Sequence, residues 1–212
     1  MDITLVAVMG ANGVIGSGSN KPMFVAQHAA FVKQYAQGKP VIMGRKTYEA
    51  LGGGIPGADN YVLTRNFALS IAAFDNVTTA LALDGAFISA FERKMANELV
   101  VLGGAATFHA FYPWANRMHI THIRENIEGD RFFPSYPGWR PGLINDRYEQ
   151  GETQFERIDY RRDDWHYYPN ETPEDVNTLI ILNAIRTQRG YRPLKTEQHE
   201  PPIADHQADG SV

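Results

Sequence analysis

The segment PVIMGRKTYEAL, residues 40–51, ends an apolar run with a glycine and continues with two cations and a hydroxyl. Gly44 follows the run directly, and Arg45, Lys46 and Thr47 open a helical pattern. Backbone N–H groups at such a helix start attract phosphate, and neighbouring cations add positive charge. The spacing therefore indicates a site for a phosphorylated ligand.

Two further segments carry the same kind of signal. In VVLGGAATFHAF, Gly103 and Gly104 follow an apolar run, and in NYVLTR another run ends with Thr64 and Arg65. Paired glycines let a pyrophosphate approach the backbone closely. Arginine matches a phosphate with two hydrogen bonds, so Arg65 together with the cations of the first segment favours a cofactor with a 2′-phosphate. We therefore predict binding of NADPH rather than NADH.

Alternating strands and helices must position these residues. Short β-branched apolar runs, which are typical of buried strands, occur at 3–9, 40–43, 60–64, 98–102 and 118–123. Helical spacing follows in two places, on the face formed by Phe24, His28, Phe31, Val32 and Tyr35, and again over residues 84–97. Residues 154–163 alternate apolar and polar side chains, as in an edge or antiparallel strand.

This order of elements predicts an α/β fold with a mostly parallel sheet covered on both faces. The carboxyl ends of the strands in such a sheet form the usual place for a ligand. The three glycine and cation segments all follow predicted strands, so we expect them to converge at that edge.

The pattern changes after about residue 165. Thr172 is a plausible N-cap, Pro173 suits the first helical position and Gly190 ends the run, which predicts a helix over 173–189. We therefore divide the chain into a domain over 1–165, an extension with one helix over 166–192, and a polar, disordered tail over 193–212.

Composition limits the possible functions. The 212 residues are 43% hydrophobic, which suits one domain with an appendage. The formal net charge of −4 without a basic stripe argues against nucleic acid as a partner. The chain has no cysteine, so disulfides and thiolate chemistry are excluded, and no metal site is predicted. No apolar stretch approaches a membrane span or a signal peptide, so a cytoplasmic monomer acting on a small molecule is expected.

Taken in their order along the chain, these segments resemble the dihydrofolate reductase family. The resemblance covers roughly residues 1–165 and runs through AVMGANGVIG, KPVIMGRKTYEALG, IPGADNYVLTR, VVLGGAATFHAFYPWANRMHITHI and EGDRFFP. It implies a twisted sheet of about eight strands with flanking helices. It also implies reduction of dihydrofolate by hydride transfer from NADPH, with GVIGSGSNKPM as a mobile loop that closes over the site.

The resemblance further implies roles for individual positions. The residues expected at the cofactor are Ala7, Ile15, Gly44, Arg45, Lys46, Thr47, Leu63, Thr64, Arg65, Leu102, Gly103, Gly104, Ala105, Ala106 and Thr107. The residues expected at the substrate are Val6, Ala7, His28, Ala29, Val32, Lys33, Leu51, Phe108 and Thr121. Of these, His28 and Thr121 are the expected catalytic residues.

Three positions depart from the family pattern. The helix position that carries the family's carboxylate is His28, and no Asp or Glu lies between Asp2 and Glu49 to replace it. Met23 stands where the family has a tryptophan. The arginine that clamps the α-carboxylate of folate corresponds to Ala58.

His28 changes the expected chemistry of the pterin site. A neutral imidazole has one acceptor nitrogen and an imidazolium has none, so one pterin donor loses a charged partner. That loss costs about 1.5–3 kcal/mol, or one to two decades in binding or rate. A histidine that titrates near neutrality can instead deliver a proton itself, directly or through a water at Thr121. The alternative is an inert histidine on an apolar helix face, just as Lys33 and Met23 can be residues without a chemical role.

Three functions follow from these observations. The first is NADPH-dependent reduction of 7,8-dihydrofolate or a closely related reduced pteridine. The second is an NADPH-dependent reductase of a heterocycle that lacks the glutamate tail, because both His28 and Ala58 remove a folate anchor. The third is a non-catalytic nucleotide- or folate-binding protein whose C-terminal helix docks on a partner.

Overall fold

The computed structural model describes residues 2–18, 25–64, 77–80 and 97–162. The chain divides into two compact units, Met1–Tyr168 and Pro169–Val212. The second unit lies outside the described residues, and so do the helices predicted over 84–97 and 173–189 and the tail over 193–212. Among the described residues, none of the helices combines the length and hydropathy that crossing a bilayer requires.

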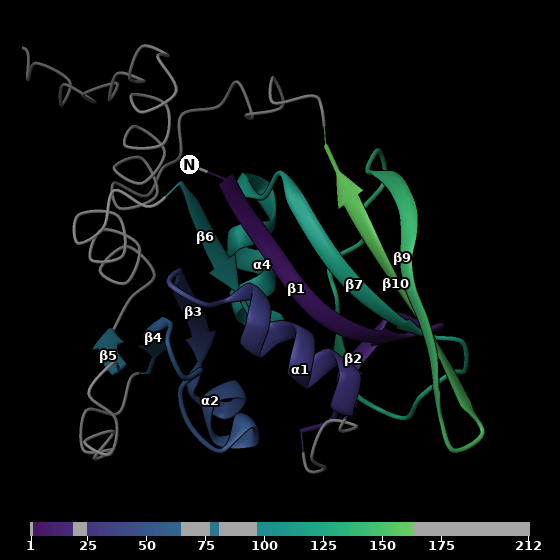
Figure 1. Ribbon diagram of the computed structural model, residues 1–212, viewed down its shortest axis with the longest axis horizontal. Helices are drawn as coiled ribbons and strands as arrows, with labels where there is room; N and C mark the ends of the chain where they lie inside the picture. Colours follow the sequence, from purple (N-terminus) through teal and green to yellow (C-terminus); the bar gives the residue numbers. More distant parts are fainter. Residues whose placement is uncertain (1, 19–24, 65–76, 81–96, 163–212) are drawn as a thin grey trace, which may run out of the picture. The chain divides into compact units, whose positions relative to one another are not determined.

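An eight-stranded sheet forms the centre of the first unit (Figure 1). Its strands, in spatial order, are β5 (Val77–Ala80), β4 (Asp59–Leu63), β3 (Pro40–Gly44), β6 (Glu98–Val101), β1 (Asp2–Gly10), β7 (Arg117–Ile123), β10 (Thr153–Arg161) and β9 (Arg140–Gln150). The first six are parallel, whereas β10 is antiparallel to both β7 and β9. The predicted mostly parallel α/β sheet and its antiparallel strand near residues 154–163 are therefore confirmed.

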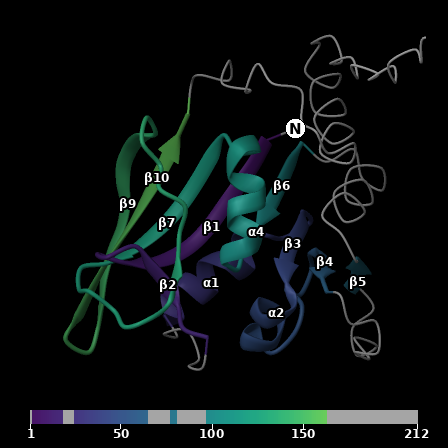
Figure 2. The same ribbon diagram turned by 180° about the vertical axis from the view of Figure 1, so that it is seen from behind.

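Short helices flank this sheet. They are α1 (Ala26–Tyr35), α2 (Arg45–Leu51), α4 (Ala105–Phe111) and the 3-10 turn η1 (Tyr112–Trp114). Helix α1 lies on one face of the sheet and α4 on the other, as the two opposite views show (Figures 1 and 2). A separate two-stranded sheet joins β2 (Val14–Gly16) to β8 (Arg131–Phe132).

The centre of the sheet is apolar because its strands are covered on both faces. Ile3 and Leu5 of β1, Ile42 of β3 and Val101 of β6 have no exposed surface. Burying such side chains stabilises the fold by about 1.5–3 kcal/mol each. These are the runs that the sequence pattern predicts as strands, so the local pattern and the packing agree.

In the part of the chain that the structure describes, the sequence pattern missed four strands, β2, β5, β8 and β9. The position of β9 at the edge of the sheet explains why this longest one was missed. Strand β9, with the sequence RPGLINDRYEQ, is mostly exposed and lacks an apolar run. It forms because it pairs antiparallel with β10 through a hairpin in which Gly151 has φ of 65°. Backbone pairing stabilises such a strand without an apolar signature.

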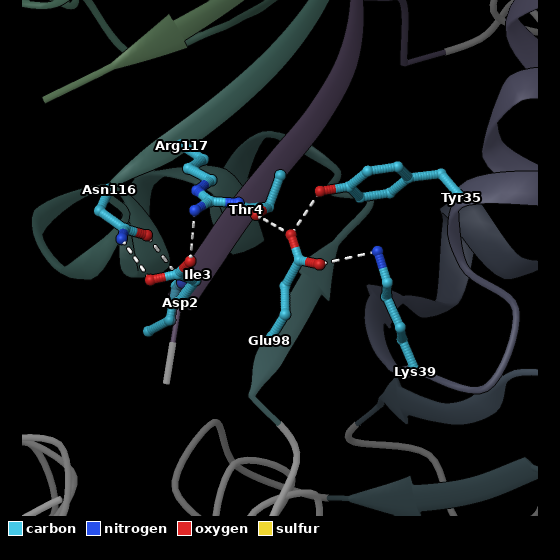
Figure 3. Close-up of polar contacts among 8 residues, drawn as sticks. All are labelled: Asp2, Ile3, Thr4, Tyr35, Lys39, Glu98, Asn116 and Arg117. Atoms are coloured by element: carbon cyan, nitrogen blue, oxygen red, sulfur yellow. Dashed lines mark hydrogen bonds and ion pairs between the residues drawn. The ribbon is translucent and has the colours of Figure 1, made fainter.

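A cluster of polar contacts joins the C-terminal end of α1 to the start of β6 (Figure 3). The Glu98 carboxylate accepts hydrogen bonds from Thr4 Oγ1 at 2.5 Å and from the Tyr35 hydroxyl, and Lys39 Nζ lies 2.7 Å away. Burial disfavours the charged form, but Lys39, Thr4 and Tyr35 outweigh it and hold the pKa of Glu98 below its ordinary value. Burial and the neighbouring Glu98 raise the pKa of Tyr35. This Glu98 cluster fixes the end of α1 against the sheet.

Candidate active site

Two strand-to-helix turns meet at the carboxyl ends of β3 and β6. The Gly44 N–H donates a hydrogen bond of 2.6 Å to the Gly103 carbonyl, and the Leu102 N–H donates one of 2.9 Å to the Ile42 carbonyl. The structure thus brings together the two glycine segments that the sequence analysis expected at this edge. Their helices, α2 and α4, begin directly at the contact.

Close packing explains the glycines at this contact. A Cβ on Gly103 would lie 2.4 Å from the Phe108 ring, and the φ of Gly103 is +91°, which other residues rarely adopt. A Cβ on Gly44 would lie 3.3 Å from Thr107 Oγ1. Side chains at these positions would fill the space where two backbones and two helix starts approach one another.

The first turns of α2 and α4 leave their backbone N–H groups without a side-chain cap. Neither turn contains an acidic residue. The Thr47 hydroxyl oxygen lies 3.6 Å from the position of a Cβ on Gly104, so a hydroxyl from one helix borders the turn of the other. This donor set fits the pyrophosphate of a dinucleotide.

The predicted cations are only partly placed at this edge. Arg45 Nη1 forms an ion pair of 2.7 Å with Glu49 Oε1 one turn further along α2. Lys46 is exposed. Arg65 lies outside the described residues, as does Met23. The convergence of Arg45, Lys46 and Arg65 on a 2′-phosphate therefore stays a prediction.

His28 and Thr121 form the polar pair that the resemblance suggested. His28 lies near the start of α1 and Thr121 on β7, and His28 Nδ1 is 2.9 Å from Thr121 Oγ1. Thr121 is fully buried and His28 is half-buried. Because Thr121 occupies Nδ1, Nε2 is the ring nitrogen that can meet a ligand.

The structure corrects the expectation that His28 titrates near neutrality. Burial, followed by the positive charge of Arg157, lowers the pKa of His28 from 6.5 to about 4. Both causes disfavour the imidazolium. His28 is therefore neutral at neutral pH and cannot act there as a pre-protonated acid.

Two neighbours of the His28 and Thr121 pair were not predicted from the sequence. Arg157 on β10 is the register partner of Thr121, and its guanidinium carbon lies 4.1 Å from the centre of the Phe31 ring. The Tyr148 hydroxyl on β9 is buried near Thr121 but makes no hydrogen bond of ordinary geometry with the described residues, and burial raises its pKa. The alternation over residues 154–163 indicates which face Arg157 shares, but only the pairing of β7, β10 and β9 brings these residues to His28.

The other predicted substrate residues fall into two groups. Val6 and Val32 are buried together in one apolar cluster, which also contains Leu102 and Ala58, the residue at the position of the family's folate clamp. By contrast, Lys33 is exposed, and Leu51 is exposed to 45%. The apolar group belongs to the hydrophobic core that packs against Phe31 and Tyr35 of α1, whereas Lys33 and Leu51 face the surface.

The remaining predicted residues lie on strands, turns and helices of the same unit and differ in burial. Ala7, Thr64, Thr107 and Phe108 are buried, Ile15, Ala29, Leu63 and Ala105 are half-buried, and Ala106 is exposed. Ala7 and Val6 lie on β1 between β6 and β7, so they separate the glycine turns from the His28 and Thr121 pair. The sheet order therefore places the glycine turns on one side of β1 and the His28 and Thr121 pair on the other.

Comparison with known proteins agrees with this architecture. The family model described as dihydrofolate reductase matches residues 2–171. A dihydrofolate reductase of Neisseria meningitidis serogroup A is 38% identical over 136 residues, which cover 64% of this chain and 80% of that protein. That of Haemophilus influenzae is 31% identical over 157 residues, covering 73% and 92%. Dihydrofolate reductase type A13 of Escherichia coli is 30% identical over 160 residues, covering 76% and 94%.

The fold has a match among solved structures. Dihydrofolate reductase from Enterococcus faecalis, solved in complex with NADP(H) and RAB-propyl, superposes with a TM-score of 0.64 at 24% identity, covering 77% of this chain and 97% of that one. At this identity the match supports the fold. With the family model and the relatives, it shows that the chain belongs to the dihydrofolate reductase family of NADPH-dependent oxidoreductases.

Proposed function

We propose that this chain reduces 7,8-dihydrofolate, or a closely related reduced pteridine, to the tetrahydro form. The observation that carries the proposal is the pairing of His28 with Thr121 on one side of β1 and the contact of Gly44 with Gly103 on the other. A polar ring edge and a phosphate-binding edge are both needed for a reductase that brings a heterocycle to a dinucleotide.

NADPH would be held by the two glycine turns, with Thr47 and the uncapped backbone donors at its phosphates, and it supplies a hydride when bound. The apolar cluster that contains Val6, Val32 and Leu102 would exclude water beside the site. Excluding water protects a reactive hydride donor and strengthens the polar contacts that remain.

His28 and Thr121 act on the ring edge of the substrate in this proposal. Two tautomers are possible for the neutral imidazole: the Thr121 hydroxyl donates to Nδ1 and Nε2 carries hydrogen, or Nδ1–H donates to Thr121 and Nε2 accepts. The pair can therefore hold either a donor or an acceptor of the ring. The proton that the ring nitrogen receives then comes from water at this edge, since His28 carries no spare proton at neutral pH.

A reductase of a heterocycle without a glutamate tail is the second candidate. Ala58, at the position of the family's folate clamp, is only 2% exposed and packs in the apolar cluster. The described residues thus place no cation at that position. The predicted non-catalytic binding role is not needed for either candidate, and its docking helix lies outside the described residues.

An absorbance assay with NADPH and dihydrofolate from about pH 5 to 8 tests the proposal. Oxidation of NADPH that depends on dihydrofolate supports it, and a pteridine without the glutamate tail separates the two candidates by its KM. Because the pKa of His28 is about 4, the rate should show no step from this residue between pH 5.5 and 8. Tight NADPH binding without oxidation of the cofactor by either substrate would contradict both candidates.

A further inference from the structure

Arg157 is a fixed positive charge behind the His28 and Thr121 pair. Arg157 and Thr121 are directly paired neighbours on β10 and β7, and both side chains contact α1, Thr121 at His28 and Arg157 at Phe31. His28 and Phe31 are three residues apart, so they share one face of the helix. The guanidinium therefore lies on the side of the pair that faces away from the glycine turns.

The charge of Arg157 is only partly compensated. Its nearest acidic partner among the described residues is Asp146, whose Oδ2 lies 3.8 Å from Arg157 Nη1. The Asp146 side chain is 47% exposed, whereas that of Arg157 is 18% exposed. An exposed, long ion pair contributes little, and arginine stays protonated at any ordinary pH. A net positive potential therefore remains at the buried end of the pair.

We propose that Arg157 is a positioning residue that sets substrate choice at the His28 and Thr121 edge, excluding cationic ring systems and favouring neutral or anionic heterocycles. The inference rests on the proposed function, because it names the kind of ring that this same site accepts. A carboxylate at position 28 would attract a protonated ring. Here the edge offers a neutral imidazole, a hydroxyl and a cation behind them.

The electrostatics of the neighbouring groups agree with this geometry. Burial and Arg157 both lower the pKa of His28, so the imidazole is neutral and leaves the guanidinium as the charge beside the pair. The titratable groups on the strands packed here are Asp146 and Tyr148 of β9, Asp159 of β10 and His119 of β7. Asp159 pairs with His119 and also interacts electrostatically with Arg157, whereas Asp146 is the carboxylate that forms an ion pair with Arg157.

The test compares two ring systems that differ at one group. 2-Amino-4-oxopteridine is neutral near neutral pH, whereas 2,4-diaminopteridine has an amine in place of the oxo group and protonates more readily. Their dissociation constants are measured by calorimetry with NADPH present, at pH 6 and pH 8. The wild-type chain should prefer the oxo ring by about tenfold or more at pH 6, and less at pH 8, where the diamino ring loses its charge.

Four variants separate charge from structure. Arg157→Met should reduce the preference for the oxo ring about tenfold, while Arg157→Lys should keep it. Asp146→Asn should increase the preference for the oxo ring severalfold, because it removes the carboxylate that forms the ion pair with Arg157. Arg161→Met removes the same charge from an exposed position on the same strand and should leave the preference unchanged.

The pKa of His28, measured by NMR titration of its ring, gives a second readout. It would not change if Arg157 had only a structural role. The pKa of His28 should rise in Arg157→Met but stay below 6.5, because burial, the larger cause, remains. It should fall further in Asp146→Asn. If Arg157→Met does not fold, the other two variants test the same inference. Arg157→Lys should keep the preference for the oxo ring, and Asp146→Asn should increase it.

Two results overturn the inference while leaving the proposed function intact. In the first, Arg157→Met weakens the binding of both rings equally. In the second, Arg157→Met changes neither the ring preference nor the pKa of His28, while dihydrofolate turnover stays at the wild-type level. A wild-type chain that binds NADPH but neither ring, and does not oxidise it with dihydrofolate, contradicts the proposed function as well.

Discussion

The two ends of helix α1 carry polar clusters of opposite kinds. At the C-terminal end, the Glu98 carboxylate accepts hydrogen bonds from Thr4 and Tyr35 and forms an ion pair with Lys39. Each of its oxygens therefore has a partner (Figure 3). At the N-terminal end, His28 contacts Thr121 through one nitrogen, and the Tyr148 hydroxyl is buried near Thr121 without a hydrogen bond of ordinary geometry to the described residues.

This difference separates stability from binding. Polar groups that already form hydrogen bonds with one another hold a helix in place, and a ligand would add no further hydrogen bond to them. Buried polar groups with unused hydrogen-bonding capacity cost stability until a ligand supplies the partner. We therefore expect changes at the Glu98 cluster to alter the free energy of unfolding, and changes at the His28 end to alter turnover and ligand choice.

The largest expected effect comes from giving the His28 end a charged acceptor. His28→Asp should raise kcat/KM for dihydrofolate about ten- to hundredfold, because a carboxylate accepts two hydrogen bonds from the pterin edge. Steady-state kinetics measure this change. Gln27→Asp adds the same charge at an exposed neighbouring position and should have no such effect. Unchanged turnover with intact NADPH binding would show that the pocket does not receive a pterin.

Breaking the Glu98 cluster should destabilise the fold. Glu98→Gln leaves Lys39 without its charged partner and weakens the contacts of Thr4 and Tyr35, which should cost about 2 kcal/mol in the free energy of unfolding. Denaturant titration measures the loss. The matched control Glu49→Gln removes an exposed ion pair and should cost less than about 0.5 kcal/mol. Equal losses would remove the distinction between the two ends of α1.

The two clusters should also respond to acid in different pH windows. The folded-state pKa of His28 is below its unfolded value, so the unfolded chain binds the proton first and stability falls as pH drops from 6.5 to about 4. This loss should be about 1 to 2 kcal/mol, and His28→Gln should abolish it. The pKa of Glu98 is also depressed, so its contribution is present above the unfolded value of 4.5 and disappears below it. Urea titrations at several pH values distinguish the windows, and a His28→Gln chain with the wild-type slope between pH 6.5 and 4 would contradict the assignment.

Cofactor selectivity should change by a smaller amount. Replacing Arg45 and Arg65 by Ala should raise the Kd for NADPH severalfold to tenfold and leave that for NADH nearly unchanged. Glu49→Gln should instead lower the Kd for NADPH, because it releases Arg45 from its ion pair. Fluorescence titration measures both constants. An equal loss for the two cofactors would mean that these cations do not bind a 2′-phosphate.

The smallest expected effect is that of the C-terminal tail. Both ends of α1 and both glycine turns lie within the first unit, and residues 193–212 offer little apolar surface that could stabilise it. Truncation after Arg192 should therefore keep the Tm and the NADPH affinity. A large decrease in either quantity would show that the tail packs on the domain.

Local patterns predicted much of the sheet and half of the site. The apolar runs that became β1, β3, β4, β6 and β7 are buried on both faces, so each strand carries its own signal. The glycine turns were predictable for the same reason, since backbone geometry and phosphate chemistry are both encoded within a few residues. His28 was found because the resemblance assigns a chemical role to its position.

The charge around His28 could not be predicted, because it depends on contacts between distant strands. Arg157 and Tyr148 belong to strands β10 and β9, which follow the other predicted site residues in the chain, and each looks like an ordinary surface or edge residue in sequence. Their approach to Thr121 depends on the antiparallel register of β7, β10 and β9.

The sequence by itself thus determined the strands, the turns and the identity of the residue at position 28. Only the tertiary structure decided that this histidine is neutral, because its pKa depends on its burial in the fold and on a guanidinium from strand β10. Burial and long-range electrostatic interactions are sums over neighbours, and the neighbours exist only after the sheet has formed.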